Sequence, residues 1–191
     1  SFVFNPHKWL FTNFDCSAYF VQDSERLVNT FKLVPEYLKS QIAGHVNDYS
    51  NWGIQLGRRF RALKLWFVIR SYGIRGLQDK LRKHIAIAAE LKSWIEKHDE
   101  FELMAPVQFS LVCFRFHPAG MDSNEDLNRI NEKLLLEVNS TGKMYITHTK
   151  LDGRYTLRLA TSQTHVETNH AREAWKLILG KAGMLKNSIN R

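Results

Sequence analysis

A hairpin signal near the C-terminus most constrains the fold. Residues 143–161, KMYITHTKLDGRYTLRLAT, read as two strands joined by Leu-Asp-Gly-Arg, because Asp-Gly favours the tight turn between antiparallel neighbours. Residues 109–117, FSLVCFRFH, predict a further strand with alternating apolar side chains, and residues 101–105, FELMA, predict another. We therefore expect a small antiparallel sheet.

Helical patterns flank these strands. Residues 76–98 carry apolar side chains at three- and four-residue steps, which is the spacing of an amphipathic helix. Residues 123–140 start with Ser123 or Asn124 as a cap and acids in the first turn, and residues 165–183 form the last helical pattern. Together the elements predict an α+β domain with helices on one face of the sheet.

The N-terminal third is less regular. Residues 14–21 look like a buried strand, and residues 24–32 like a short helix capped by Ser24. Residues 33–57 show no clear period, and a long irregular segment is usually functional or mobile. The pattern becomes helical from Arg58.

The change from an irregular to a regular sequence pattern predicts that the chain has two parts. We predict that residues 1–64 form one part, and that residues 65–191 form a linking helix and a self-contained small α+β domain. A chain of 191 residues is long enough for one large domain or for parts of two.

Composition and charge disfavour several classes of protein. No apolar run could span a bilayer, and the start of the chain lacks the pattern of a signal peptide. Cys16 and Cys113 lie in apolar runs and read as buried free thiols, which favours a reducing compartment such as the cytoplasm. The formal net charge of +8 fits a solvated basic surface, or a piece of a larger assembly, better than a nucleic-acid partner, because no nucleic-acid-binding motif is present.

Lys8 stands in an almost uncharged run, FNPHKWLFTNFDCSAYF, residues 4–20. An amine shielded among aromatic side chains can act as a nucleophile and form an imine with pyridoxal phosphate. A lysine that extends its tip to the surface is the simpler interpretation, and composition alone favours it.

The wider motifs resemble the group II pyridoxal-phosphate decarboxylases, most closely the aromatic L-amino acid decarboxylases. NPHKW and NFDCSA are followed in the same order by VPEYLK, LGRRFRALKLWF and LVCFRF. The resemblance covers essentially the whole chain, more weakly after residue 117. It implies the C-terminal part of a fold-type I α/β enzyme, in which residues 1–64 end the large cofactor-binding domain.

The resemblance also implies the cofactor contacts. Lys8 would form the Schiff base with pyridoxal phosphate, while Asn5 and His7 would lie near the phosphate, to which both can donate hydrogen bonds. Structural hydrogen bonds at a tight turn are the alternative for these two residues. Gly57 would lie near substrate and cofactor, where its missing side chain leaves room. We expect no metal site.

Tyr37 is the second catalytic residue that the resemblance implies. It would lie on a mobile loop, about residues 33–56, that closes over the active site of the partner subunit, and would donate a proton to Cα after CO₂ leaves. Family members with phenylalanine here tend to be aldehyde synthases, so Tyr37 favours amine formation. A tyrosine that only packs the loop is the alternative.

The sequence indicates different roles for its arginines. In related enzymes an arginine of the small domain binds the substrate carboxylate, and Arg158 fits that position; a structural ion pair is an equal alternative. Arg58 and Arg59 are interpreted as interface or structural cations. We assign Arg115 and His148 to the fold.

The function that the resemblance implies is a lyase of amine biosynthesis. It would decarboxylate an aromatic L-amino acid of the dihydroxyphenylalanine, tyrosine, tryptophan or 5-hydroxytryptophan type, as a homodimer with shared active sites. An aromatic aldehyde synthase is the alternative enzyme. A non-catalytic module that binds an acidic partner or nucleic acid through residues 58–64 is the other alternative, and the intact NPHKW motif argues against it. We expect no membrane partner.

The family's chains extend further before the lysine. We therefore expect the N-terminal part of the same enzyme as a partner that supplies the ring contacts and most of the phosphate contacts. The chain would then be a cleaved piece that stays with its other half, an artificially divided sequence, or a separately made C-terminal chain.

Overall fold

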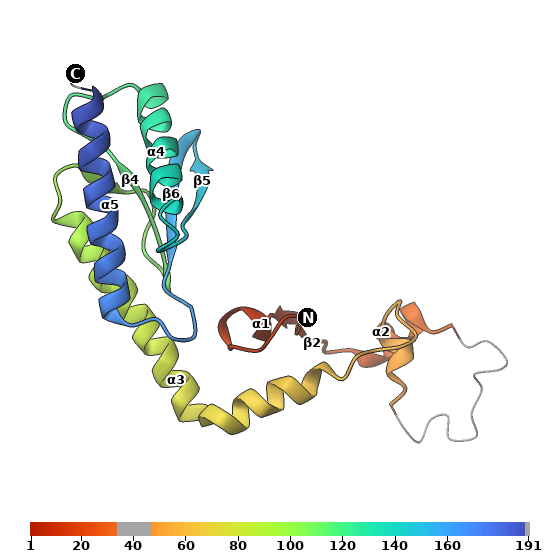
Figure 1. Ribbon diagram of the computed structural model, residues 1–191. Helices are drawn as coiled ribbons and strands as arrows, with labels where there is room; N and C mark the ends of the chain where they lie inside the picture. The colour runs from red at the N-terminus through yellow and green to blue at the C-terminus, as the bar shows by residue number, and fades with distance from the viewer. Residues whose placement is uncertain (34–46, 190–191) are drawn as a thin grey trace. The chain divides into compact units, whose positions relative to one another are not determined.

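A computed structural model describes residues 1–33 and 47–189 (Figure 1). The chain divides into two compact units, Ser1–Gly73 and Ile74–Arg191. The sequence predicted a boundary between residues 64 and 65. The assignment of the two parts to domains of a larger enzyme stays a prediction. Among the described residues, no helix is long and apolar enough to cross a membrane.

The Ile74–Arg191 unit contains an antiparallel sheet with the strand order β3-β4-β6-β5. The four strands are β3 Phe101–Leu103, β4 Leu111–Phe116, β5 Thr147–Leu151 and β6 Arg154–Ala160. Asp152 and Gly153 turn between β5 and β6 with φ of 50° and 76°, a backbone region that suits these residue types. The predicted hairpin and the α+β character are therefore confirmed.

Helices complete the hydrophobic core of this unit. They are the second part of α3 (α3 as a whole spans Arg61–Glu96), α4 Asn124–Asn139 and α5 Thr168–Ile189. In Figure 1, α4 and α5 lie side by side next to the sheet. The Ser123 side chain accepts a hydrogen bond from the Asp126 amide, so the predicted cap of α4 is confirmed. Core side chains from all three helices and from the strands include Leu91, Ile95, Phe114, Leu134, Leu157 and Ile178.

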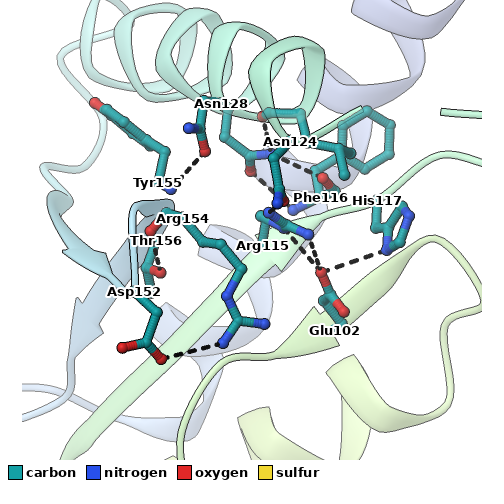
Figure 2. A network of polar contacts seen from close by, with 12 residues as sticks. Glu102, Arg115, Phe116, His117, Asn124, Asn128, Asp152, Arg154, Tyr155 and Thr156 are labelled. Carbon is teal, nitrogen blue, oxygen red and sulfur yellow. Dashed lines mark hydrogen bonds and ion pairs between the residues drawn. The ribbon is translucent and has the colours of Figure 1, made fainter. Parts of the chain in front are cut away.

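A buried asparagine fastens α4 to the sheet. Asn131 is fully buried. Its side chain accepts from the Phe116 amide and donates to the Phe116 carbonyl, both at 2.8 Å, and it also donates to the Leu127 carbonyl at 2.8 Å. Phe116, the partner in two of these contacts, is labelled in Figure 2.

The opposite face of the sheet is polar. Arg115 alternates with core residues Phe114 and Phe116 along β4, and its side chain is 5% exposed. It donates to Glu102 at 2.8 Å and to Asn124 at 3.3 Å, and Figure 2 shows His117 directed at the same carboxylate. A buried guanidinium needs such partners, because an unpaired buried charge is costly. Arg115 thus ties β3, β4 and the start of α4 together.

The Ser1–Gly73 unit consists of short elements. They are β1 Phe2–Phe4, α1 Pro6–Trp9, β2 Ala18–Phe20, α2 Ser24–Phe31, the 3₁₀ helix η2 Tyr49–Trp52, and the first part of α3. β1 and β2 pair as antiparallel strands, with Val3 opposite Tyr19. Gly73 interrupts α3 with non-helical angles, φ 67° and ψ 170°.

Three local predictions for this unit were wrong in detail. The strand predicted for residues 14–21 is limited to β2, and Tyr19 and Phe20 are exposed, because β1 and β2 each supply only three residues. Asp23 rather than Ser24 caps α2, since its carboxylate accepts the Arg26 amide at 3.0 Å. The helix expected from Arg58 begins at Arg61.

Candidate active site

Lys8 lies on a single helical turn, which we call the Lys8 turn, residues 5–10. Pro6 occupies the first position of α1, where its fixed φ suits a helix and its missing N–H costs nothing. The Lys8 amide donates to the Asn5 carbonyl at 2.9 Å, and the Leu10 amide donates to the Pro6 carbonyl at 3.2 Å. The NPHKW sequence therefore folds locally into a tight turn that presents successive side chains.

His7 and Asn5 are each anchored at one end. The His7 amide donates to the Cys16 carbonyl at 3.2 Å, and His7 Nδ1 lies 2.7 Å from that oxygen and 3.1 Å from the Cys16 amide nitrogen. Asn5 Oδ1 accepts from the Ser17 hydroxyl at 2.6 Å. The nitrogens at the other ends, His7 Nε2 and Asn5 Nδ2, make no hydrogen bond within the described part of the chain.

Lys8 itself is exposed. Its Nζ forms no hydrogen bond or ion pair with any described residue. The turn thus carries a primary amine, an imidazole nitrogen and an amide NH₂, and Nε2 can donate in the tautomer in which Nδ1 accepts from the Cys16 amide. An amine that can form an imine, beside two donors for an anion, fits an aldehyde that carries a phosphate. These three residues fit pyridoxal phosphate in this chemical sense.

An acidic residue that sequence reasoning missed lies beside the Lys8 turn. Asp15 pairs with Arg59 through Oδ1 and accepts from Arg61 Nε at 3.0 Å through Oδ2. Partial desolvation raises the pKa of Asp15, but the Arg61 hydrogen bond and the two guanidinium charges outweigh it and lower that pKa overall. Arg59, interpreted from the sequence as an interface or structural cation, here pairs with Asp15. The sequence signal was a lone acid in NFDCSA with basic residues in LGRRFR.

Gly57 and Tyr37 are the other predicted site residues of the Ser1–Gly73 unit. Gly57 is exposed, and a Cβ built on it would meet nothing within 4 Å. Tyr37 lies outside the described residues, as does most of its predicted loop. Tyr49, on η2, packs against Trp52 with ring centroids 5.5 Å apart.

Arg158 lies on β6, in the other unit, opposite Cys113 of β4. Burial raises the pKa of the Cys113 thiol, and this outweighs the charge and hydrogen bond of Arg158, which lower it. Arg158 is half-buried and forms no ion pair with a described carboxylate. Its guanidinium is therefore available for an anion as far as the described residues are concerned.

Comparisons with known proteins show what this chain is similar to. The profile described as Pyridoxal-dependent decarboxylase conserved domain matches residues 1–117. The chain is 43% identical to tyrosine decarboxylase 1 of Narcissus pseudonarcissus, over 99% of this chain and 38% of that protein. It is 44% identical to aromatic-L-amino-acid decarboxylase of Sus scrofa (97% and 37%) and 42% identical to phenylacetaldehyde synthase of a Rosa hybrid cultivar (93% and 37%).

A solved structure gives the same result for the fold. The crystal structure of Oryza sativa TDC with PLP and tryptamine matches with a TM-score of 0.91 at 38% identity, over 96% of this chain and 38% of that chain. The chain spans about 38% of the length of the relatives it matches. Both decarboxylases and an aldehyde synthase stand among those relatives, so similarity alone does not separate the two activities.

Proposed function

Because the chain belongs to the pyridoxal-dependent decarboxylase family, we propose that its protein converts an aromatic L-amino acid to the amine and CO₂ with pyridoxal phosphate. The substrate is of the dihydroxyphenylalanine, tyrosine, tryptophan or 5-hydroxytryptophan type. The observation that carries the proposal is the Lys8 turn, which carries an amine without a described partner together with two side chains that are each anchored at one end.

The chain's own residues divide the work at the cofactor. When bound, pyridoxal phosphate withdraws electrons from the bond between the substrate's Cα and its carboxylate. Lys8 Nζ is the point of attachment for the cofactor's aldehyde carbon. His7 Nε2 and Asn5 Nδ2 donate to the phosphate, and the anchors at Cys16 and Ser17 hold both side chains in place.

Tyr37 returns a proton to Cα in this proposal. A phenol keeps its proton at neutral pH and can donate it over a short hydrogen bond. The resemblance supports this role through the motif VPEYLK, and it makes amine formation the preferred outcome over aldehyde formation.

Arg158 binds the substrate carboxylate, and Gly57 leaves room for the substrate near the cofactor. The guanidinium of Arg158 lacks a described carboxylate partner, and its two parallel donors match a carboxylate. A decarboxylase gains rate only from contacts that are stronger in the transition state. We therefore expect Arg158 to contribute to substrate affinity more than to the rate of the chemical step.

Attachment at Lys8 is the first test of the proposal. The full-length protein is reduced with borohydride, digested and mapped by mass spectrometry. We expect a pyridoxyl-phosphate adduct on the peptide that contains Lys8, and neither adduct nor amine product in Lys8→Ala. An unmodified Lys8 in a protein that still forms amine would overturn the assignment.

Tyr37→Phe separates the two enzyme activities. We expect less amine and, in its place, aldehyde, ammonia and hydrogen peroxide, with one O₂ and one water consumed per aldehyde formed. Tyr49→Phe is the matched control, because Tyr49 lies on η2 and has no assigned chemical role. Unchanged amine output from Tyr37→Phe, with no peroxide, would remove Tyr37 from the mechanism.

We further propose a cytoplasmic homodimer with shared active sites, completed by the N-terminal part of the same enzyme. Large exposed apolar side chains in the Ser1–Gly73 unit support the need for a covering partner, and the described free thiols of Cys16 and Cys113 suit a reducing compartment. The exposed side chains include Phe2, Phe14, Phe20, Ile54, Phe60 and Phe67.

Mixed dimers test whether the sites are shared. If Lys8 and Tyr37 of one site come from different subunits, a dimer of one Lys8→Ala and one Tyr37→Phe chain contains one intact site. Such a mixture should form more amine than either variant forms alone. No recovery in isolated mixed dimers would mean that each site is built within a single subunit.

A further inference from the structure

We infer that Asp15 is a positioning residue for Lys8, which acts through a clamp made of Asp15, Arg59 and Arg61. The inference rests on the proposed function for the role of Lys8. The clamp itself is a feature of this chain, and it can be tested without turnover. None of its three members lies in the Lys8 turn.

The clamp uses each oxygen of one carboxylate for a different arginine. Asp15 Oδ1 pairs with Arg59, and Asp15 Oδ2 accepts from Arg61 Nε at 3.0 Å. The side chains of Asp15 and Arg61 are both 28% exposed, whereas that of Arg59 is 72% exposed. Water screens the outer pair more strongly, so we expect the Asp15–Arg61 pair to carry most of the effect.

The clamp joins segments that are far apart along the chain. Arg59 and Arg61 are 44 and 46 residues from Asp15. The Cys16 thiol is buried and lies 4.0 Å from the Arg61 carbonyl oxygen, so a second contact accompanies the ion pairs. By contrast, the Asp79–Arg82 pair joins residues three apart on α3. A pair of that kind cannot hold two separate segments together.

A short path of contacts leads from the clamp to the Lys8 turn. Asp15 is followed by Cys16, whose carbonyl oxygen accepts from the His7 amide at 3.2 Å and whose backbone also contacts His7 Nδ1. Ser17, the next residue, donates to Asn5. Residues 15–17 therefore support the turn at two points, on both sides of Pro6.

Lys8 depends on this support more than its neighbours do. Its side chain has no described partner, so the position of Nζ is set by the backbone of the turn. If residues 15–17 move away from residues 59–61, the hydrogen bonds of Cys16 and Ser17 to the turn are displaced with them. The Lys8 amine is then no longer held in one position. We expect the first consequence to be weaker attachment of pyridoxal phosphate.

The test compares Asp15→Asn with Asp79→Asn in the full-length protein. Both variants remove one carboxylate charge that faces arginine, and Asp79 lies at a helix surface with its side chain 72% exposed. Two quantities are measured: the dissociation constant of pyridoxal phosphate, from an absorbance titration, and the thermal midpoint of the apoprotein. We expect Asp15→Asn to weaken cofactor binding about tenfold, while Asp79→Asn has no effect. The thermal midpoint should change little in either variant.

A double variant and hydrogen exchange make the result specific. Asp15→Asn combined with Arg61→Gln should bind the cofactor no more weakly than Asp15→Asn alone, because both substitutions open the same clamp. Amide exchange in the peptide of residues 4–20, measured without cofactor, should be faster in Asp15→Asn than in Asp79→Asn. Unchanged exchange and affinity would overturn the inference, as would a loss of affinity matched by a fall in the thermal midpoint.

Failure of the proposed function would look different. A protein that attaches pyridoxal phosphate at Lys8 but forms no amine from aromatic amino acids would contradict the proposed reaction. The difference in cofactor affinity between Asp15→Asn and Asp79→Asn would still decide the role of the clamp. If no cofactor binds at all, hydrogen exchange alone decides it.

Discussion

The two units of the chain keep their apolar side chains in opposite places. In the Ile74–Arg191 unit, Phe114, Leu134 and Ile178 are completely buried. In the Ser1–Gly73 unit, Phe14 is 83% exposed and Phe60 is 76% exposed. The Ile74–Arg191 unit buries its own hydrophobic core. The Ser1–Gly73 unit carries the candidate site and leaves large apolar side chains exposed. Lys8 thus stands on the part of the chain whose apolar side chains are least buried.

Each unit is stabilised internally by a different kind of interaction. Apolar burial dominates in the Ile74–Arg191 unit, and it is the main favourable term in folding. The Lys8 turn is held instead by hydrogen bonds to Cys16 and Ser17 and by the Asp15 clamp. Mutations that remove apolar volume should therefore affect the units unequally.

The largest expected difference comes from removing one phenylalanine in each unit. Phe114→Ala should lower the free energy of unfolding of this chain by about 3–5 kcal/mol, because it leaves a cavity in a packed core. Phe60→Ala should change it by less than about 0.5 kcal/mol, as expected for an exposed position. Urea unfolding of the two variants measures both values. Equal losses would show that Phe60 is packed in solution, and would end the contrast between the units.

A smaller loss is expected from the buried amide of α4. Asn131→Leu keeps the size of the side chain but leaves the Phe116 amide and carbonyl without their partner, at a cost of about 2–3 kcal/mol. Asn187→Leu, at an exposed position of α5, is the control and should be nearly neutral. If Asn131→Leu matched its control in urea unfolding, the polar link between α4 and β4 would not matter for stability.

The ion pair across β3 and β4 should contribute less again. Glu102→Gln leaves the buried Arg115 guanidinium with neutral acceptors, and we expect a loss of about 1–2 kcal/mol, since Glu102 is itself partly exposed. Asp79→Asn, which removes an exposed ion pair, should lower the free energy of unfolding by at most about a few tenths of a kcal/mol. Chemical unfolding at neutral pH compares the two, and an equal cost would place Glu102 among ordinary surface ion pairs.

The smallest effect concerns pH. Burial lowers the pKa of His84, and Lys80 and Lys83 lower it further, while Glu167 opposes them. The unfolded chain then binds a proton first, so stability is lost as pH falls below about 6.5, the usual value for histidine. His84→Gln should flatten this part of the stability curve, and the exposed His165→Gln should not. An unchanged curve for His84→Gln would assign the acid sensitivity to other groups.

Local signals predicted the Ile74–Arg191 unit well. The Asp152-Gly153 turn and the Ser123 cap act within a few residues, and both specify a backbone shape that the rest of the unit agrees with. The strand expected at residues 14–21 shows where such signals fail. An aromatic, β-prone run needs a partner to pair with and a core to enter, and in this unit β1 supplies only three paired residues.

The candidate site could be predicted only in part. NPHKW identified Lys8, Asn5 and His7 by resemblance, and their local hydrogen bonds follow from a tight turn. The Asp15 clamp could not be derived, because a separation of 44 to 46 residues between an acid and its arginines leaves no local pattern. Only the folded chain brings those charges together.

Gly73 shows that one residue can fix a shape without filling any space. Its angles, φ 67° and ψ 170°, belong to a region that is nearly closed to other residues. Yet a Cβ built there would touch nothing within 4 Å, so the restriction comes from the backbone alone. In Gly73→Ala the backbone angles at residue 73 would change. Residues 61–96 would tend to form one uninterrupted helix, since alanine favours the helix more than glycine does. In a mutational survey, other residues would therefore be disfavoured at position 73 although no neighbouring atom excludes a larger side chain.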